Sequence, residues 1–476
     1  MKKKIIGTVV FLALAAAFLW KLNDIFSLKQ EDGILPMEVF YEQEPGSIDV
    51  MFYGSSHTYS DINPAVLWEE AGIPSYDLAG SLQPLWNTYY YMKESLKYQR
   101  PKVMVVELVR AIEDRDYIEE ARTVTNTFGM KFSEEKVENL KASTAEEYVT
   151  DYLLGYPVYH SRYTELSRAD FADYGGDPNG SASKGFYPLF VTKSFESMSD
   201  MSQVTEIGEL SEKSEEYLRK LIALAKEEDI PLVFMISPYQ GIIESEQAVF
   251  NCCAEIAAEE GVPFLDFNQM YEELGLDPAS DFAEASHLNY RGSTKLSAWL
   301  ASWLKEMYEL PDRRGGELYA SWDQNAADWN QKYENQLLAE EEGWYDLLQL
   351  LPESGDGYYT YVISLNGNYD NGEQPLKETL TEIGVPEVIA EQGGVYIGGA
   401  DGETVLPAGT DGFCHLEWEH SDLEVTVSPG GMIFLYEGEN QIRAADGLNV
   451  LVYDHFTESL VTAVGFSAAD GYSCVR

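Results

Sequence analysis

Two stretches far apart in the sequence carry residue types that together perform nucleophilic catalysis. The stretch Ile48–His57 contains a Gly-Ser-Ser sequence that ends at Ser56, and the stretch Asp281–Asn289 contains Glu284 three residues before His287. A serine hydroxyl is a weak nucleophile that needs a neighbouring base, and the base needs a third group to hold its tautomer. We therefore predict Ser56 as the nucleophile, His287 as the base and Glu284 as the acid that orients the base.

The elements expected around these residues favour their meeting. The apolar run before Gly54 predicts a buried strand that ends in a tight turn at the rim of a parallel sheet. His287 follows the last predicted strand and precedes a predicted helix, so its loop reaches the same rim. Asp281 is the alternative carboxylate if Glu284 points away. His57 is expected to have a structural part, because consecutive residues point apart.

Length and charge exclude some classes of protein. The chain has 476 residues, of which 45% are hydrophobic, so it can bury more than one core and two or three domains are expected. The formal net charge of −49 argues against nucleic acid and against anionic membrane surfaces as partners, because a polyanion is repelled by both.

The N-terminus has the composition of a membrane anchor. Three lysines at 2–4 precede an apolar run from Ile5 to Trp20, after which Lys21 returns. Lysines before an apolar segment keep the N-terminus in the cytoplasm and send the following chain across the membrane. We therefore expect a single-pass protein of the cell membrane, with residues 1–21 as the anchor and the bulk of the chain extracytoplasmic. Cleavage at the alanines of 13–17 stays the alternative.

The four cysteines are compatible with both free thiols and disulfides. Four cysteines in an exported chain permit disulfides without requiring them. Cys252 and Cys253 are adjacent in a helical pattern, which favours two free thiols because a bond between neighbours strains the backbone. A bond between Cys414 and Cys474 stays possible on sequence grounds.

Between residues 47 and 308, strand and helix patterns alternate. Apolar runs that alternate with helices are typical of a parallel sheet covered on both faces, and five strands suffice for a flavodoxin-like three-layer α/β sandwich. The predicted strands are 48–54, 75–79, 102–109, 231–237 and 263–267, and the predicted helices are 62–71, 84–99, 209–228, 244–260 and 291–307.

The remaining segments differ from this α/β region in composition and in predicted secondary structure. Residues 22–46 are predicted to be a polar stalk, and residues 111–205 a tyrosine-rich insert that either covers the carboxyl ends of the strands or serves packing alone. Residues 309–356 are expected to be an acidic helical linker. From 357 to 476, short strands punctuated by glycine predict a separate β-rich domain with one helix at 375–382.

Three motifs of residues 47–308 resemble the SGNH (GDSL-like) hydrolase superfamily. Gly54-Ser55-Ser56 is similar to its first block, Gly80 to the glycine of the second, and Glu284-Ala285-Ser286-His287 to its Asp-x-x-His block with Glu in place of Asp. The resemblance is to the exported branch that includes alginate O-acetyltransferases and the teichoic acid D-alanylation accessory protein. It implies an acyl-enzyme at Ser56 and an oxyanion hole that includes the Gly80 N–H.

The sequence departs from that family at two places. The asparagine of the third block, a side-chain donor to the oxyanion, is absent where Glu107 stands, and Glu284 is one methylene longer than the usual acid. A missing donor of this kind costs roughly a hundredfold or more in rate. The backbone N–H of Ser56 remains, and Gln83 or Asn87 is expected to supply the lost donor.

The stretch Gly447–Asp454, and the strand Val362–Leu365 with the short helix and Leu380–Gly384 after it, carry a second resemblance. In this pattern residues 357–476 are similar to an interleukin-like (ILEI-type) domain, which implies carbohydrate or partner binding without chemistry. The His415–His420 segment alternates along a strand and is expected to be solvated rather than metal-binding. No cofactor and no metal are expected.

Together these features predict a serine esterase or O-acyltransferase that acts on a cell-surface polysaccharide. The resemblance implies, as a partner, a polytopic membrane O-acyltransferase that delivers the acyl group. The alternatives left open are hydrolase against transferase, and a non-catalytic glycan-binding or assembly protein of the cell envelope.

Overall fold

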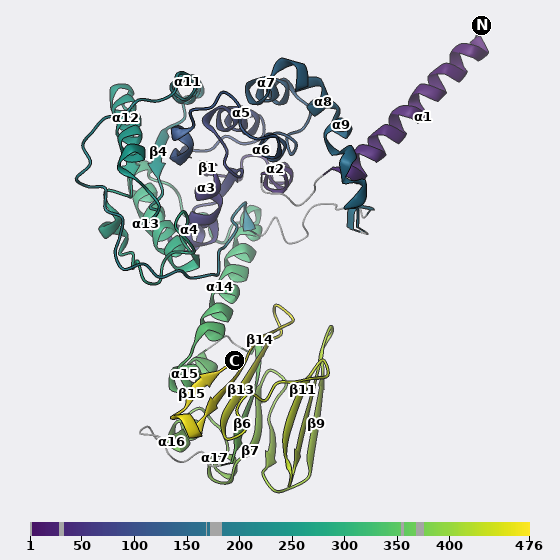
Figure 1. The fold of residues 1–476 in the computed structure, drawn as a ribbon, viewed down its shortest axis with the longest axis vertical. Coiled ribbons are helices and arrows are strands. Elements are labelled where there is room, and N and C mark those ends of the chain that lie inside the picture. Colours follow the sequence, from purple (N-terminus) through teal and green to yellow (C-terminus); the bar gives the residue numbers. More distant parts are fainter. Residues whose placement is uncertain (1, 28–32, 168, 172–182, 354–356, 368–375) are drawn as a thin grey trace. The chain divides into compact units, whose positions relative to one another are not determined.

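The computed structural model describes residues 2–27, 33–167, 169–171, 183–353, 357–367 and 376–476 (Figure 1). The chain divides into two compact units, Met1–Ala327 and Asp328–Arg476. The first unit is α/β and the second consists mainly of antiparallel strands.

A five-stranded parallel sheet lies at the centre of the first unit. Its order, β2-β1-β3-β4-β5, is that of a flavodoxin-like doubly wound sheet. All strand residues but one are buried, which explains why the sequence shows apolar runs rather than alternation. The strands are β1 (Val50–Gly54), β2 (Ser75–Ala79), β3 (Val103–Glu107), β4 (Leu232–Ile236) and β5 (Phe264–Asp266), which confirms the predicted strands.

Helices cover both faces of this sheet. One apolar core holds side chains of α5 (Leu85–Ser95), α11 (Glu212–Glu228) and α12 (Glu244–Glu260). The other holds side chains of α4 (Pro64–Ala71) and α13 (Tyr290–Tyr308). In α13 the fully buried Leu296, Leu300 and Leu304 follow each other at four-residue spacing. Burial of one such side chain contributes about 1.5–3 kcal/mol, which fixes this helix, and the loop before it, on the sheet.

The N-terminal segment forms one helix that is long enough to be a membrane anchor and a second helix inside the predicted stalk. Helix α1 (Lys2–Phe26) contains a 22-residue apolar stretch, Ile5–Phe26, that is long enough to cross a membrane and has 0% of its most apolar window buried in the protein. Within the predicted stalk, Ile34–Phe40 forms helix α2 instead. Its Met37 and Phe40 are completely buried in the first core, because they are apolar residues that pack beside β2.

The described part of the insert forms short helices up to Phe171 and irregular chain from 184 to 205. Its helices are α6 (Glu120–Thr125), α7 (Glu134–Ser143), α8 (Val149–Leu154) and α9 (Tyr156–Tyr159), with three short 3₁₀ turns. Its last portion runs along the elements that carry the predicted site. The N–H of Tyr187 donates to the carbonyl of Tyr59, and the N–H of Lys193 donates to the carbonyl of Phe282. The insert is therefore in contact with both halves of that site.

The predicted linker is part of both units. Helix α14 (Ala320–Glu340) buries Trp322 in the first core and Leu338 in the core of the second unit, and α15 (Trp344–Glu353) buries Leu347, Leu348 and Leu351 in the second. These apolar side chains explain why the acidic segment is ordered.

The second unit has two antiparallel sheets, confirming its predicted β-rich character (Figure 1). The six-stranded sheet has the order β15-β14-β13-β6-β7-β8, and the four-stranded sheet has the order β12-β11-β10-β9. The predicted helix is α16 (Leu376–Glu382), and α17 (Glu387–Gln392) is a second one that the sequence pattern missed. All four cysteines are free thiols, Cys414 and Cys474 included. The strands are β6 (Tyr359–Asn366), β7 (Gly394–Gly399), β8 (Thr404–Pro407), β9 (Gly412–Glu417), β10 (Asp422–Ser428), β11 (Gly431–Tyr436), β12 (Glu439–Asn440), β13 (Gly447–Asp454), β14 (Ser459–Ser467) and β15 (Ser473–Val475).

Candidate active site

Ser56 lies where the chain turns from a strand into a helix. Strand β1 ends at Gly54, and the short helix α3 (Ser56–Asp61) begins immediately after Ser55. Gly54 has φ 149°, and a Cβ there would collide with Thr58 Oγ1 and with Glu107. Only glycine is tolerated at such a position. The sharp turn leaves Ser56 half-buried at the carboxyl edge of the sheet, as the sequence predicts.

His287 lies in a loop that is closed by its own backbone. The N–H of Ala283 donates to the carbonyl of His287 at 3.0 Å, and the N–H of Asn289 donates to the carbonyl of Asp281 at 3.0 Å. The Asn289 side chain then caps α13 by accepting from Arg291 and Gly292. The loop therefore presents His287 from a fixed base.

The three predicted side chains meet in one hydrogen-bonded chain. Ser56 Oγ lies 2.8 Å from His287 Nε2, and His287 Nδ1 lies 2.5 Å from Glu284 Oε1, although Ser56 and His287 are 231 residues apart in the sequence. Hydroxyl and carboxylate thus occupy opposite nitrogens of the ring. This arrangement lets the imidazole take the hydroxyl proton while the acid holds its other N–H.

The surroundings of Glu284 lower its pKa and so favour its ionised form. Burial alone would raise its pKa, but the Ser286 N–H, which donates to Oε2 at 2.9 Å, and the His287 imidazole outweigh burial, so that the pKa is lowered. Asp281, the alternative acid, is engaged elsewhere. Its completely buried carboxylate pairs with Lys295 Nζ at 2.6 Å and accepts from the N–H of Asp277.

Buried titratable groups of α3 lie behind this chain. The ring of His57 is 4.7 Å from that of His287 and 5.2 Å from that of Tyr239, and burial lowers its pKa. Asp61 Oδ2 lies 3.3 Å from His57 Nδ1, and Oδ1 accepts from the N–H of Leu288 at 3.0 Å. Burial raises the pKa of Asp61 to about 8. His57 is therefore a packing partner of the predicted base.

Glu107 lies beside the same turn. It ends strand β3 and is 2% exposed. Its Oε2 accepts from Ser55 Oγ at 3.3 Å and its Oε1 accepts from the N–H of Val109 at 2.6 Å. Burial raises its pKa to about 7. A protonated Glu107 donates a hydrogen bond, whereas an ionised one repels an oxyanion nearby.

The candidate oxyanion donors are placed less favourably than the sequence predicts. The Gly80 N–H donates to the carbonyl of Gly54 at 3.4 Å, the long end of the hydrogen-bond range. The Gln83 amide donates to Thr88 at 3.3 Å. Asn87 donates to Asn139 at 2.7 Å and to a neighbouring hydroxyl, that of Ser143, at 2.8 Å. These contacts engage both side-chain amides within the fold.

Asn126 was missed by sequence reasoning. This buried residue of the insert donates to the carbonyls of Ser81 and Arg122, and its Oδ1 lies so close to Gly80 that a Cβ at that glycine would collide with it. It therefore fixes the backbone that carries the Gly80 N–H. No local motif marks Asn126, since its partner lies in a different element. Asp61 did carry a signal, the four-residue spacing from His57.

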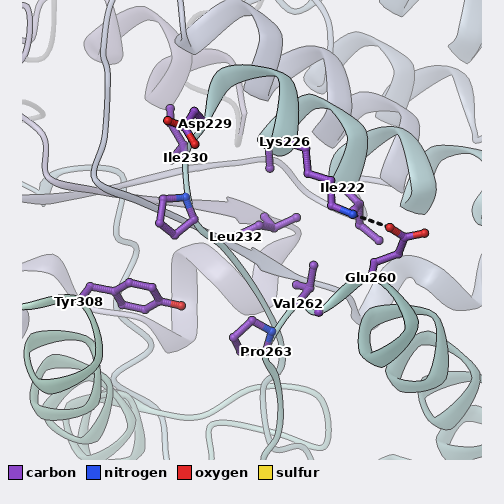
Figure 2. A pocket seen from close by; sticks show the side chains of 12 residues that line it. Ile222, Lys226, Asp229, Ile230, Leu232, Glu260, Val262, Pro263 and Tyr308 are labelled. Carbon is purple, nitrogen blue, oxygen red and sulfur yellow. Dashed lines mark hydrogen bonds and ion pairs between the residues drawn. The ribbon is translucent and has the colours of Figure 1, made fainter.

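A separate cavity lies at the opposite edge of the sheet. Its volume is about 440 Å³, and its walls come from the amino ends of β4 and β5 together with α11, α12 and α13. Figure 2 shows the lining side chains, with Lys226 and Glu260 paired at 2.5 Å. Among the described residues that line it there is no serine, cysteine or histidine. The candidate active site therefore lies at the carboxyl edge, with Ser56.

No protein-family model matches the chain, and no curated protein is significantly similar to it.

Proposed function

We propose that this protein performs serine-dependent acyl-ester chemistry, O-acyl transfer or de-esterification, on a cell-surface polysaccharide. The observation that carries the proposal is the hydrogen-bonded chain from Ser56 Oγ through both nitrogens of His287 to Glu284. A nucleophile, a base and an orienting acid in this order form the constellation that acyl transfer requires.

The first half of the reaction follows from the contacts. Ser56 Oγ attacks the acyl carbonyl carbon while His287 Nε2 accepts the hydroxyl proton, and Glu284 accepts the Nδ1–H and stabilises the imidazolium. The tetrahedral intermediate collapses as the ester C–O bond breaks, and His287 returns the proton to the leaving oxygen. The product is an acyl ester on Ser56.

The second half decides between transfer and hydrolysis. A sugar hydroxyl or a water attacks the acyl-serine carbonyl, His287 accepts its proton, and collapse returns the proton to Ser56 Oγ. The acyl group then resides on the glycan or leaves as a free acid. Contacts of the insert with both halves of the site support a role for residues 184–195 in forming the acceptor wall.

Oxyanion stabilisation is expected to limit the rate. The Ser56 N–H, at the first position of α3, is one donor, and the Gly80 N–H becomes a second only when its long bond to Gly54 opens. Loss of one donor costs about 10²–10³ in kcat. A slow enzyme is therefore expected, unless acyl-donor binding reorders the Gly80 turn.

The place of action is proposed from the N-terminus and from the resemblance. The apolar helix and the lysines before it support a single-pass anchor with the bulk of the chain outside the cytoplasm. The sequence resemblance to the exported SGNH branch supports a polysaccharide acceptor and a polytopic O-acyltransferase as donor partner.

A fluorophosphonate probe tests the proposal, because it reacts with an activated serine. The purified full-length chain in detergent is expected to be labelled, and Ser56→Ala to lose all labelling. Ser55→Ala is the matched control, since its hydroxyl contacts Glu107 instead of an imidazole, and it is expected to keep labelling. Absence of labelling in the folded wild type would favour the non-catalytic glycan-binding or assembly role.

Acetate release from an aryl ester divides the two reactions. A hydrolase releases acetate at the same rate with and without a glycan acceptor. A transferase releases the phenol faster when acceptor is added and forms an acylated glycan in equal amount.

A further inference from the structure

Helix α3 carries the predicted nucleophile at its first residue and a completely buried carboxylate at its last. Asp61 is 0% exposed. Its Oδ1 accepts from the N–H of Leu288 at 3.0 Å, and Leu288 is the residue that follows His287. One short helix therefore contacts both the hydroxyl side and the imidazole side of the candidate site.

The other hydrogen bonds of the His287 loop lead to different elements. Asp281 is held by Lys295 of α13, and the carbonyl of Ala285 accepts from the N–H of Gly241, in the loop after β4. Together with the Lys193 N–H, which donates to the carbonyl of Phe282, these contacts fix the loop to its own helix, to the loop after β4 and to the insert. The bond from Leu288 to Asp61 instead ties it to the helix that begins at Ser56, and so sets the distance across which the proton must move.

The second carboxyl oxygen makes the same residue a neighbour of both imidazoles. Asp61 Oδ2 faces His57 Nδ1 at 3.3 Å, and the His57 ring packs at 4.7 Å against that of His287. Asp61 therefore hydrogen-bonds to the backbone beside His287 and also lies next to the ring that packs against His287. A buried N–H that loses its acceptor keeps its full desolvation penalty, so removal of the Asp61 oxygen favours a displaced loop.

We propose, on the premise of the function proposed above, that Asp61 is a positioning residue whose hydrogen bond to the Leu288 N–H holds His287 within reach of Ser56. It acts without touching the acyl group. The acceptor oxygen, rather than the negative charge, is the feature that matters for this role.

The experiment compares fluorophosphonate labelling rates of Ser56 in full-length variants. Asp61→Asn keeps an oxygen that accepts from Leu288 and is expected to label within about threefold of wild type. Asp61→Leu, which has the same branching but bulkier methyl groups, removes the acceptor and is expected to label at least tenfold more slowly. Asp49→Asn breaks a partly buried ion pair with Arg313 at the other edge of the sheet, and this matched control is expected to label at the wild-type rate.

A proton NMR measurement adds a readout that general destabilisation does not move. The Nδ1–H shared by His287 and Glu284 is expected to give a strongly downfield resonance in wild type and Asp61→Asn, and to lose it in folded Asp61→Leu. Asp61→Ala, which also lacks the acceptor, replaces the leucine variant if that variant does not fold.

The two proposals fail in different ways. A folded wild type that takes no probe overturns the proposed function. A wild type that is labelled, together with a leucine or alanine variant labelled equally fast, overturns the positioning role alone. A tenfold or larger loss in Asp61→Asn also overturns it, because the acceptor oxygen is still present in that variant.

Discussion

Each unit of the molecule contains a hydroxyl, a histidine and a carboxylate in mutual contact, but the two groups differ in geometry. In the α/β unit, Ser56 and Glu284 lie on opposite nitrogens of His287. In the β-rich unit, Thr360 Oγ1 and Asp401 Oδ2 both face the same nitrogen, Nε2 of His455, at 2.9 and 3.4 Å.

The direction of the hydroxyl proton also differs. Thr360 Oγ1 donates to Asp401 Oδ2 at 2.8 Å, and the same carboxylate oxygen accepts from Trp418 Nε1 at 2.8 Å. A hydroxyl that donates to the acid does not pass its proton to the base, and an acid on the near nitrogen does not hold the tautomer. A hydroxyl, a histidine and a carboxylate in contact are therefore not sufficient for proton transfer from the hydroxyl. The hydroxyl and the carboxylate must also lie on opposite nitrogens of the imidazole ring.

A pair of histidine substitutions is expected to give the largest difference between the two groups. His287→Gln is expected to lower the rate of fluorophosphonate labelling by at least about 10³-fold, because it removes the nitrogen that contacts Ser56 Oγ and accepts its proton. His455→Gln, the matched change in the β-rich unit, is expected to leave the rate within twofold. Labelling rates of the two purified variants measure the difference, and similar losses in both would remove the distinction between the two groups.

The α/β unit also holds a buried carboxylate, Glu107, beside its Ser56–His287–Glu284 group, and this carboxylate predicts a pH effect on stability. Glu107 is buried and its pKa is raised to about 7, whereas the Asp401 side chain is 26% exposed. A raised pKa in the folded state gives stability that is present below the unfolded value of 4.5 and lost as the pH rises through about 7. Glu107→Gln does not titrate, so its stability relative to wild type should rise by about 1–3 kcal/mol from pH 4.5 to 8.

Chemical unfolding of the α/β unit at several pH values checks this slope. Lys184→Met is a control with the opposite sign. Burial lowers the pKa of Lys184 to about 7, so the stability contributed by its neutral form is lost as the pH falls through 7. The methionine variant should therefore gain on wild type as the pH falls from about 10 to 6. Parallel slopes for the two variants would contradict the assignment of either group.

The sequence was most informative where burial is periodic and local. The predicted strand at 75–79 is β2, and the predicted helix at 244–260 is α12, each with the same bounds. The proximity of Ser56 and His287 was predictable, because the carboxyl ends of parallel strands lie at one edge of a sheet.

The sequence was least informative where a contact joins distant elements. Helix α2 contains Pro36 and spans one and a half to two turns, so its burial depends on β2 rather than on its own pattern. Strands β8 and β11 show no regular alternation of apolar and polar residues, so the sequence did not indicate them. Asn87 has a donor of the right chemistry for an oxyanion, but only the fold shows that its partners lie on α7.

Substitution of Asn87 is expected to have the smallest effect on the labelling rate of Ser56. Asn87→Ala removes two buried hydrogen bonds between α5 and α7, which should lower the free energy of unfolding of the α/β unit by about 1–3 kcal/mol. Labelling of Ser56 should change less than twofold, because both amide protons are already donated within the fold. Asn449→Ala is the matched change in the β-rich unit, where a buried amide donates to the carbonyl of Ala444 at 2.9 Å, and it should destabilise that unit alone. If Asn87→Ala instead slowed labelling tenfold while Asn449→Ala did not, the amide would act on the oxyanion, and α5 would have to rearrange when the acyl donor binds.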